Sequence, residues 1–124
     1  MQDFRNLTVW QDAHALVLRL YRLTEGFPSS ERFGLASQLQ RSAASIPANL
    51  AEGSSRGSDA DFARFMQYAL GSAAETRYHL LLAFDLGWIS EEHYESLDGA
   101  YDRIGRRLNS LRTSLLHRRP ARVQ

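Results

Sequence analysis

Histidine and carboxylate side chains are the first candidates for chemistry in this 124-residue chain, which has no cysteine. A di-iron carboxylate site in a helical bundle needs a Glu three residues before a His on two helices. None of the four histidines, His14, His79, His93 and His117, has a Glu at that spacing. Glu75 lies one helical turn before His79, but such a single pair is more often a surface ion pair than a metal site. The chain also has no nucleophile elbow, phosphate-binding glycine loop or His-Glu-x-x-His motif, so we expect neither enzymatic activity nor a cofactor.

Arginine is the second candidate for chemistry, because its guanidinium group binds phosphate in a bidentate manner. Residues 103–124 hold seven Arg and no acid (+7), whereas residues 1–102 hold eight Arg and all 14 acids (−6). The arginines nominated to contact nucleic acid are Arg103, Arg106, Arg107, Arg112, Arg118 and Arg119. They predict weak, salt-dependent and sequence-tolerant binding to RNA or DNA backbones. The alternative is a solvated helix face, stabilised by cations near a helix C-terminus.

A stripe of polar residues accompanies an irregular stretch of predicted helix around Pro47, which removes a helix hydrogen bond at a cost of about 3 kcal/mol. The members of the predicted polar cluster are Gln38, Arg41, Ser45, Asn49 and Glu52 on one helix, with Ser72 and Glu75 on the next. Gly71, in the middle of that next helix, is expected to let another backbone approach closely. Since buried polar groups on facing helices usually satisfy one another, we expect this cluster to be structural.

Apolar residues recur at steps of three and four in four segments, and no alternation typical of a strand persists. The predicted helices cover residues 8–26, 30–52, 58–86 and 90–118 of a single domain, 1–124. Gly53, in a left-handed conformation, and Gly87 are expected to end the second and third helices. The apolar stripes of the third and fourth helices include Thr76 and Leu111. Short connections between long helices favour an antiparallel, up-down-up-down four-helix bundle. The fold class is therefore all-α.

Two predicted helices carry more apolar surface than one core needs. These additional residues are His14, Leu18 and Tyr21 in the first helix, and Phe65, Tyr68, Tyr78, Leu81 and Leu82 in the third. A single bundle would expose them, and large exposed apolar patches are rare in soluble monomers. We therefore expect a homo-oligomer, the alternative being a wide core stripe with tyrosines at its edge. Trp10 and Trp88 are interpreted as core or interface anchors at helix ends.

The long polar and small-residue pattern of the second predicted helix resembles the four-helix-bundle family of ribosomal-RNA intervening-sequence proteins. The pattern is Leu35-x-x-Gln38-Leu39-x-Arg41-Ser42-Ala43-x-Ser45-Ile46-Pro47-x-Asn49-Leu50-Ala51-Glu52-Gly53. Phe62-x-Arg64-Phe65 and Ala69-x-Gly71-Ser72-x-x-Glu75 follow it. The resemblance extends over residues 4–116 and implies a bacterial homopentamer. A related branch is the accessory protein of diversity-generating retroelements, a basic barrel that associates with a reverse transcriptase and nucleic acid, whereas this chain has a net charge of only +1.

These observations favour a non-enzymatic, oligomeric protein-interaction scaffold whose partners are other copies of the chain and another protein. The alternative function is nucleic-acid binding through the arginines of the last helix. No segment approaches the roughly 18 apolar residues of a membrane span, and no signal peptide is recognisable at the N-terminus, so the expected location is the cytoplasm.

Overall fold

A computed structural model describes residues 3–118 of the chain, and within them all regular structure is helical. The four long helices are α1 (Thr8–Thr24), α2 (Leu35–Ser54), α3 (Asp59–Asp85) and α4 (Glu91–His117). Two short 3-10 turns, η1 (Phe4–Asn6) and η2 (Ser29–Glu31), precede α1 and α2. The all-α class and the number of helices agree with the prediction from sequence.

The predicted start of the second helix at residue 30 is wrong by five residues. Ser29–Glu31 form the 3-10 turn η2, and Gly34 takes a non-helical conformation (φ −104°, ψ −118°) immediately before α2. The Leu35 amide donates to the Glu31 side chain at 3.1 Å, which satisfies an otherwise free N–H of the first turn. The glutamate thus acts as a cap on a helix that begins at Leu35.

Serine caps position the starts of α3 and α4. The Ser58 hydroxyl accepts from the Asp61 amide, and the Ser90 hydroxyl accepts from the His93 amide, both at 3.1 Å. Between these helices, Gly87 adopts φ +81°, a conformation that non-glycine residues rarely take. The turn predicted at Gly87 therefore lies where the backbone requires glycine.

Helix α2 continues through Pro47 and ends at Ser54, so Gly53 lies inside the helix and does not terminate it in a left-handed conformation as expected. The two serines before the proline do not bond the carbonyl that it frees. Ser42 donates to the Leu39 carbonyl at 3.3 Å, and Ser45 pairs with Ser72 on α3. Gly53 has a different role, because a Cβ there would lie 2.6 Å from the Cβ of Phe65. It is the residue that lets α2 and α3 approach closely.

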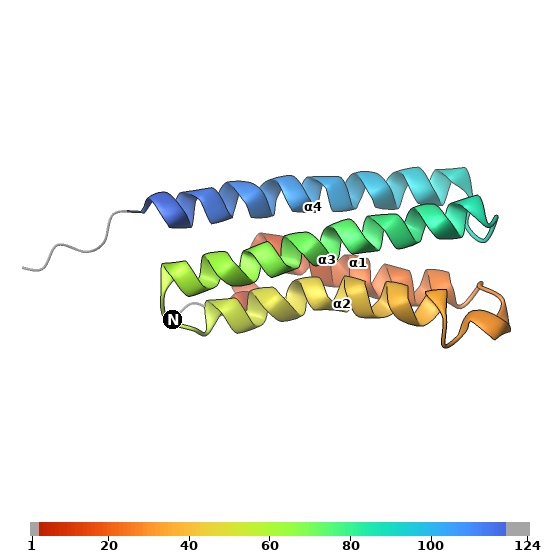
Figure 1. Cartoon of the computed structure of the whole chain (residues 1–124), viewed down its shortest axis with the longest axis horizontal. Helices are drawn as coiled ribbons and strands as arrows, with labels where there is room; N and C mark the ends of the chain where they lie inside the picture. The colour runs from red at the N-terminus through yellow and green to blue at the C-terminus, as the bar shows by residue number, and fades with distance from the viewer. Residues whose placement is uncertain (1–2, 119–124) are drawn as a thin grey trace, which may run out of the picture.

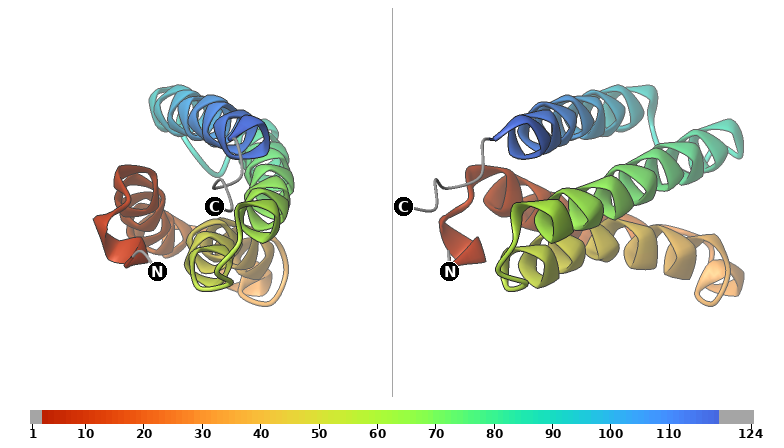
Figure 2. Two further views of the ribbon diagram at one scale, coloured as in Figure 1. Left: turned by 90° about the vertical axis from the view of Figure 1, so that its left-hand side faces the viewer. Right: turned by 60° about the vertical axis from the view of Figure 1, so that its left-hand side comes forward.

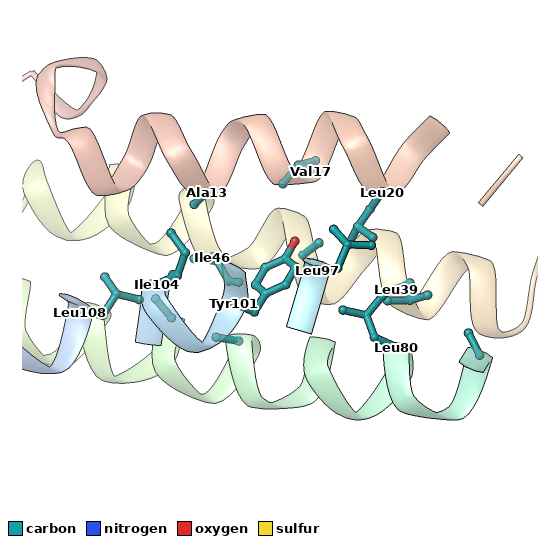
Figure 3. Packing of buried hydrophobic residues seen from close by; sticks show 14 of the residues in the cluster. Ala13, Val17, Leu20, Leu39, Ile46, Leu80, Leu97, Tyr101, Ile104 and Leu108 are labelled. Atoms are coloured by element: carbon teal, nitrogen blue, oxygen red, sulfur yellow. The ribbon is translucent and has the colours of Figure 1, made fainter. Parts of the chain in front are cut away.

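One apolar core is shared by all four helices (Figure 3). The α4 stripe supplies its centre, since Leu97, Tyr101, Ile104 and Leu108 are each at most 2% exposed. Leu111, the next member of the predicted stripe, is 40% exposed and lies beyond the core. Burial of the other members fixes which face of α4 turns inward.

The helices lie lengthwise beside one another (Figure 1). α2 packs on α1 and α3, and α4 packs on α3 and, less extensively, on α1. Seen from the end of the molecule, α1 and α3 are diagonally opposed, as are α2 and α4 (Figure 2). A solvent-facing groove with a hollow lies between α1 and α4, and another lies between α2 and α3.

Candidate interaction surfaces

The arginines of α4 are largely engaged with carboxylates inside the chain. Arg106 lies 3.0 Å from Asp102, Arg118 lies 3.4 Å from Asp59, and Arg107 pairs with Asp12. Arg107 also donates to Thr8 at 2.8 Å. Three of the six predicted phosphate-binding residues are therefore partly neutralised by acids of other helices or of α4 itself.

The remaining arginines of this set differ in their surroundings. Arg103 is exposed, makes no ion pair among residues 3–118, and lines a hollow of about 410 Å³ between α1 and α4. Arg112 is half-buried and has no acidic partner in the same range, while Arg119 lies outside the described residues. The face thus offers two unneutralised guanidinium groups in place of a continuous positive stripe.

The predicted polar cluster is divided by the structure into a connected part and a local pair. Ser45 and Ser72 hydrogen-bond across α2 and α3 at 2.8 Å, and Asn49 donates to the carbonyl and hydroxyl of Ser45 at 2.8 and 3.0 Å. Glu52 turns away and pairs with Arg56, one turn along, at 2.8 Å. Gln38, Arg41 and Glu75 line the same hollow as the two serines. The predicted Arg41–Glu75 pair is not an ion pair in the structure, since no contact within 4 Å joins them in the described chain.

Sequence reasoning missed the most buried part of this polar region. Thr76 donates to Ser42 at 2.9 Å and contacts the Ser72 carbonyl at 2.8 Å, and Nδ1 of His79 lies 3.5 Å from Ser42 Oγ. By its spacing, Thr76 is predicted to belong to the apolar stripe of its helix. The sequence pairs His79 only with Glu75, one turn earlier. The missing signal was helix register, because Ser42 and Thr76 come together only when the faces of α2 and α3 are aligned.

The apolar surface outside the core is smaller than predicted on α3 and larger elsewhere. Phe65 is only 7% exposed and Leu82 packs against the core, so neither belongs to the surface stripe. Phe65 is buried because it covers Gly53. The large apolar residues that are exposed in the described part are Leu18, Tyr21, Phe33, Tyr68, Tyr78, Leu81, Leu86, Leu111 and Leu116.

Two aromatic rings, those of Phe33 and His14, are exposed next to a cationic or aromatic neighbour. Phe33, which precedes α2, is 88% exposed and lies under the Arg32 guanidinium at 5.4 Å from the ring centroid. The His14 ring, predicted to be surplus apolar surface, is exposed and stacks on Trp10 at 5.0 Å. Trp10 and Trp88 are both half-buried against the core. The Phe33 exposure has no counterpart in the periodic pattern, because the residue lies between helical elements.

Among residues 3–118, no group of three or more His, Asp or Glu side chains is arranged to hold a metal ion. Within the same residues, no helix combines the length and hydropathy that crossing a bilayer requires.

Comparison with known proteins agrees with these features of the fold. No curated protein sequence matches the chain. A crystal structure of a protein of unknown function from the S23 ribosomal protein family of Bacteroides thetaiotaomicron VPI-5482 is similar to it, with 29% sequence identity and a TM-score of 0.78. The similarity covers 86% of this chain and 96% of that protein. Residues 5–110 match the family model of the 23S rRNA-intervening sequence protein, and the chain belongs to that family.

Proposed function

We propose that this protein is a non-enzymatic scaffold, in which antiparallel four-helix bundles assemble into a homo-oligomer that presents its helix faces to another protein. The pentamer implied by the family resemblance is the stoichiometry we favour. The observation that supports assembly is the apolar outer face of α3, where Tyr68, Tyr78 and Leu81 are 49%, 60% and 39% exposed.

The up-down-up-down order is supported by the contacts between helices. From Ser42 to Ser45 on α2, the hydrogen-bonded partner on α3 changes from Thr76 to Ser72. Contacting residues whose numbers rise along one helix and fall along its neighbour are typical of antiparallel packing. The same trend holds between α1 and α4, where Asp12 pairs with Arg107 and Arg19 bonds Ser96.

The outer face of α3 combines large and small side chains in a way that suits another helix. Gly71 and Ala74 are exposed between the tyrosines, and a Cβ on Gly71 would meet nothing within 4 Å. Residues 71, 74, 78 and 81 follow one another at steps of three and four, so they share one side of the helix. Small residues beside aromatic ones allow close packing of helices, and burial of exposed apolar area stabilises association at about 25 cal/mol per Å². We therefore assign this face to contacts between subunits.

Light scattering coupled to size-exclusion chromatography tests the proposal. The wild-type chain should elute at a multiple of its 14.1 kDa mass. A double variant, Tyr78→Arg with Leu81→Arg, should elute as smaller species because it buries two unpaired charges in the contact. The variant Ser110→Arg, which adds a charge at an exposed position of α4, is the matched control and should leave the mass unchanged.

Two results would contradict this proposal. A wild-type chain that is monomeric at every accessible concentration would exclude the proposed homo-oligomeric scaffold. An oligomer that persists in the double variant would place the subunit contacts on another face, so the assignment to α3 would be wrong.

The alternative function, nucleic-acid binding by the α4 arginines, has weaker support. The ion pairs of Arg106, Arg107 and Arg118 must be broken or shared before these residues reach phosphate. Of the nominated arginines that lie within residues 3–118, only Arg103 and Arg112 form no ion pair there. The alternative predicts RNA binding that weakens steeply with added salt, which a fluorescent RNA oligomer titrated at several salt concentrations would measure.

A further inference from the structure

The groove between α2 and α3 contains a hollow of about 450 Å³ that only polar and charged residues line. Gln38, Arg41 and Ser45 contribute from α2, while Ser72, Glu75 and His79 contribute from α3. Its volume falls in the range of small-molecule sites, about 300–1,000 Å³. A surface groove between two packed helices does not need such a concentration of hydrogen-bonding groups for folding, because exposed positions there tolerate most residues.

His79 gives this hollow an imidazole ring with one nitrogen that has no partner in the described chain. The residue is only 7% exposed, and its Nδ1 faces Ser42 Oγ at 3.5 Å. Its other ring nitrogen, Nε2, has no hydrogen-bond partner among residues 3–118. It is nevertheless in contact with solvent, because the one fully buried side-chain atom without a partner in these residues is the Tyr101 hydroxyl. Nε2 is therefore within reach of solvent, on a residue that lines the hollow. An imidazole nitrogen that has no partner in the protein and that solvent can reach is available to a ligand.

Two opposite charges at the same hollow also lack partners. In the described chain, neither Arg41 nor Glu75 forms an ion pair or a side-chain hydrogen bond, although both are exposed and both line the hollow. Other arginines of the chain, such as Arg56 and Arg64, pair with an acid three or four residues earlier. The hollow therefore presents one free cation and one free anion together with hydroxyl, amide and imidazole groups.

The composition of the lining excludes several classes of ligand. The hollow has no aromatic side chain to stack a nucleobase and no aliphatic side chain to hold an acyl chain. Glu75 opposes a ligand that is purely anionic. Glu75 and His79 provide two strong metal ligands, fewer than a tetrahedral site requires. A small ligand that carries both a carboxylate and an ammonium group matches the charges that are present.

We propose that the α2–α3 hollow binds a small dipolar molecule of the α-amino acid class. The Arg41 guanidinium pairs with the ligand carboxylate, and the Glu75 carboxylate pairs with its ammonium group. His79 Nε2 and the Ser45–Ser72 hydroxyl pair bond the remaining polar atoms of the ligand. This site adjoins the outer face of α3 that we assign to subunit contacts, but Tyr68, Tyr78 and Leu81 do not line it. It therefore adds a ligand-binding property to the scaffold.

Isothermal titration calorimetry with glycine and the L-amino acids, at millimolar concentrations, tests this inference on the full chain. At least one of them should bind saturably. Acetate and methylammonium, which each carry only one of the two charges, should bind at least about tenfold more weakly, since a charge-assisted contact contributes roughly that factor or more. Arg41→Ala and Glu75→Gln should each weaken binding of the amino acid by a similar factor.

Arg64→Ala is the matched control, because it removes an exposed α3 arginine that does not line the hollow. Its affinity should equal that of the wild type. Circular dichroism should show all three variants to be folded, since Arg41 and Glu75 make no contacts that hold the helices together. Absence of binding by every amino acid overturns the proposal, as does binding that both hollow variants retain. Equal binding of acetate and an amino acid would also overturn it, because the site would then recognise an anion alone.

Discussion

Replacing Gly53 by alanine should lower the free energy of unfolding by about 1–3 kcal/mol, the usual cost of overpacking a core. Helix propensity alone predicts the opposite sign, since alanine is favoured over glycine inside a helix by about 1 kcal/mol. Packing decides the outcome because the new Cβ would lie 2.6 Å from the Cβ of Phe65 and 3.0 Å from Cδ1 of Phe62. A Cβ is fixed to its backbone, so relief requires α2 and α3 to move apart. Urea unfolding followed by circular dichroism gives the change directly.

Gly105→Ala is the matched control, since it makes the same chemical change inside α4, where the new Cβ would meet only Leu70 Cδ2 at an ordinary 3.9 Å. It should raise the free energy of unfolding by about 1 kcal/mol, the full difference in propensity. If both alanine variants are stabilised, the close approach at Gly53 is wrong.

The existence of the four helices could be predicted from sequence because long apolar stripes at helical spacing have few competing interpretations. Capping residues then set some boundaries well, as Ser58 and Ser90 show. The start of α2 was missed because a 3-10 turn and a helical first turn use similar residues. The capping contact that distinguishes them, from the Leu35 amide to Glu31, depends on the path of the chain before the helix.

The roles of the two mid-helix glycines were exchanged in the prediction, and the reason is geometric. Gly71 was expected to allow a close approach and is open, whereas Gly53 was expected to end its helix and is the contact point. Spacing shows which residues share a face of one helix. It does not show how far the neighbouring helix is shifted along its axis, and that shift brings Phe65 over Gly53.

The candidate surfaces were predictable only in part, because charged side chains take the nearest available partner. Glu52 pairs with Arg56 at the i+4 spacing and leaves the polar cluster that its face suggested. Arg107 and Arg118 find acids on α1 and at the start of α3, positions distant in sequence. Net charge by segment therefore overstated the positive charge of α4. Two of these C-terminal arginines thus pair helices within one chain.

A buried hydroxyl in the core provides the second prediction with a large expected effect. Tyr101 is 1% exposed, and its hydroxyl is the one fully buried side-chain polar atom without a hydrogen-bond partner among residues 3–118. In Figure 3 the ring lies in the core below Val17 of α1, surrounded by apolar side chains. Leaving such a group unsatisfied costs about 1–3 kcal/mol. The aromatic ring is needed to fill the core, but its oxygen is not.

Tyr101→Phe should therefore raise the free energy of unfolding by about 1 kcal/mol at neutral pH, because it removes the unsatisfied oxygen and keeps the ring. Tyr101→Ala is the contrasting variant and should lower stability by about 3–5 kcal/mol, as expected for loss of a buried aromatic side chain. Both values follow from urea unfolding. Destabilisation by the phenylalanine variant would show that the hydroxyl has a bonding partner, such as an internal water.

The same hydroxyl makes stability sensitive to alkaline pH. Burial raises the pKa of Tyr101 well above the ordinary value of 10.0, an effect that the positive charge of Arg19 only partly offsets. Above pH 10 the unfolded chain releases this proton while the folded chain retains it, so stability falls as pH rises. The loss is about 1.4 kcal/mol by pH 11 from this residue alone. Tyr101→Phe should be free of that contribution, so the stability gap between variant and wild type should widen from pH 9 to pH 11. A gap that stays constant over this interval would mean that the Tyr101 phenol ionises as readily in the folded protein as in the unfolded chain.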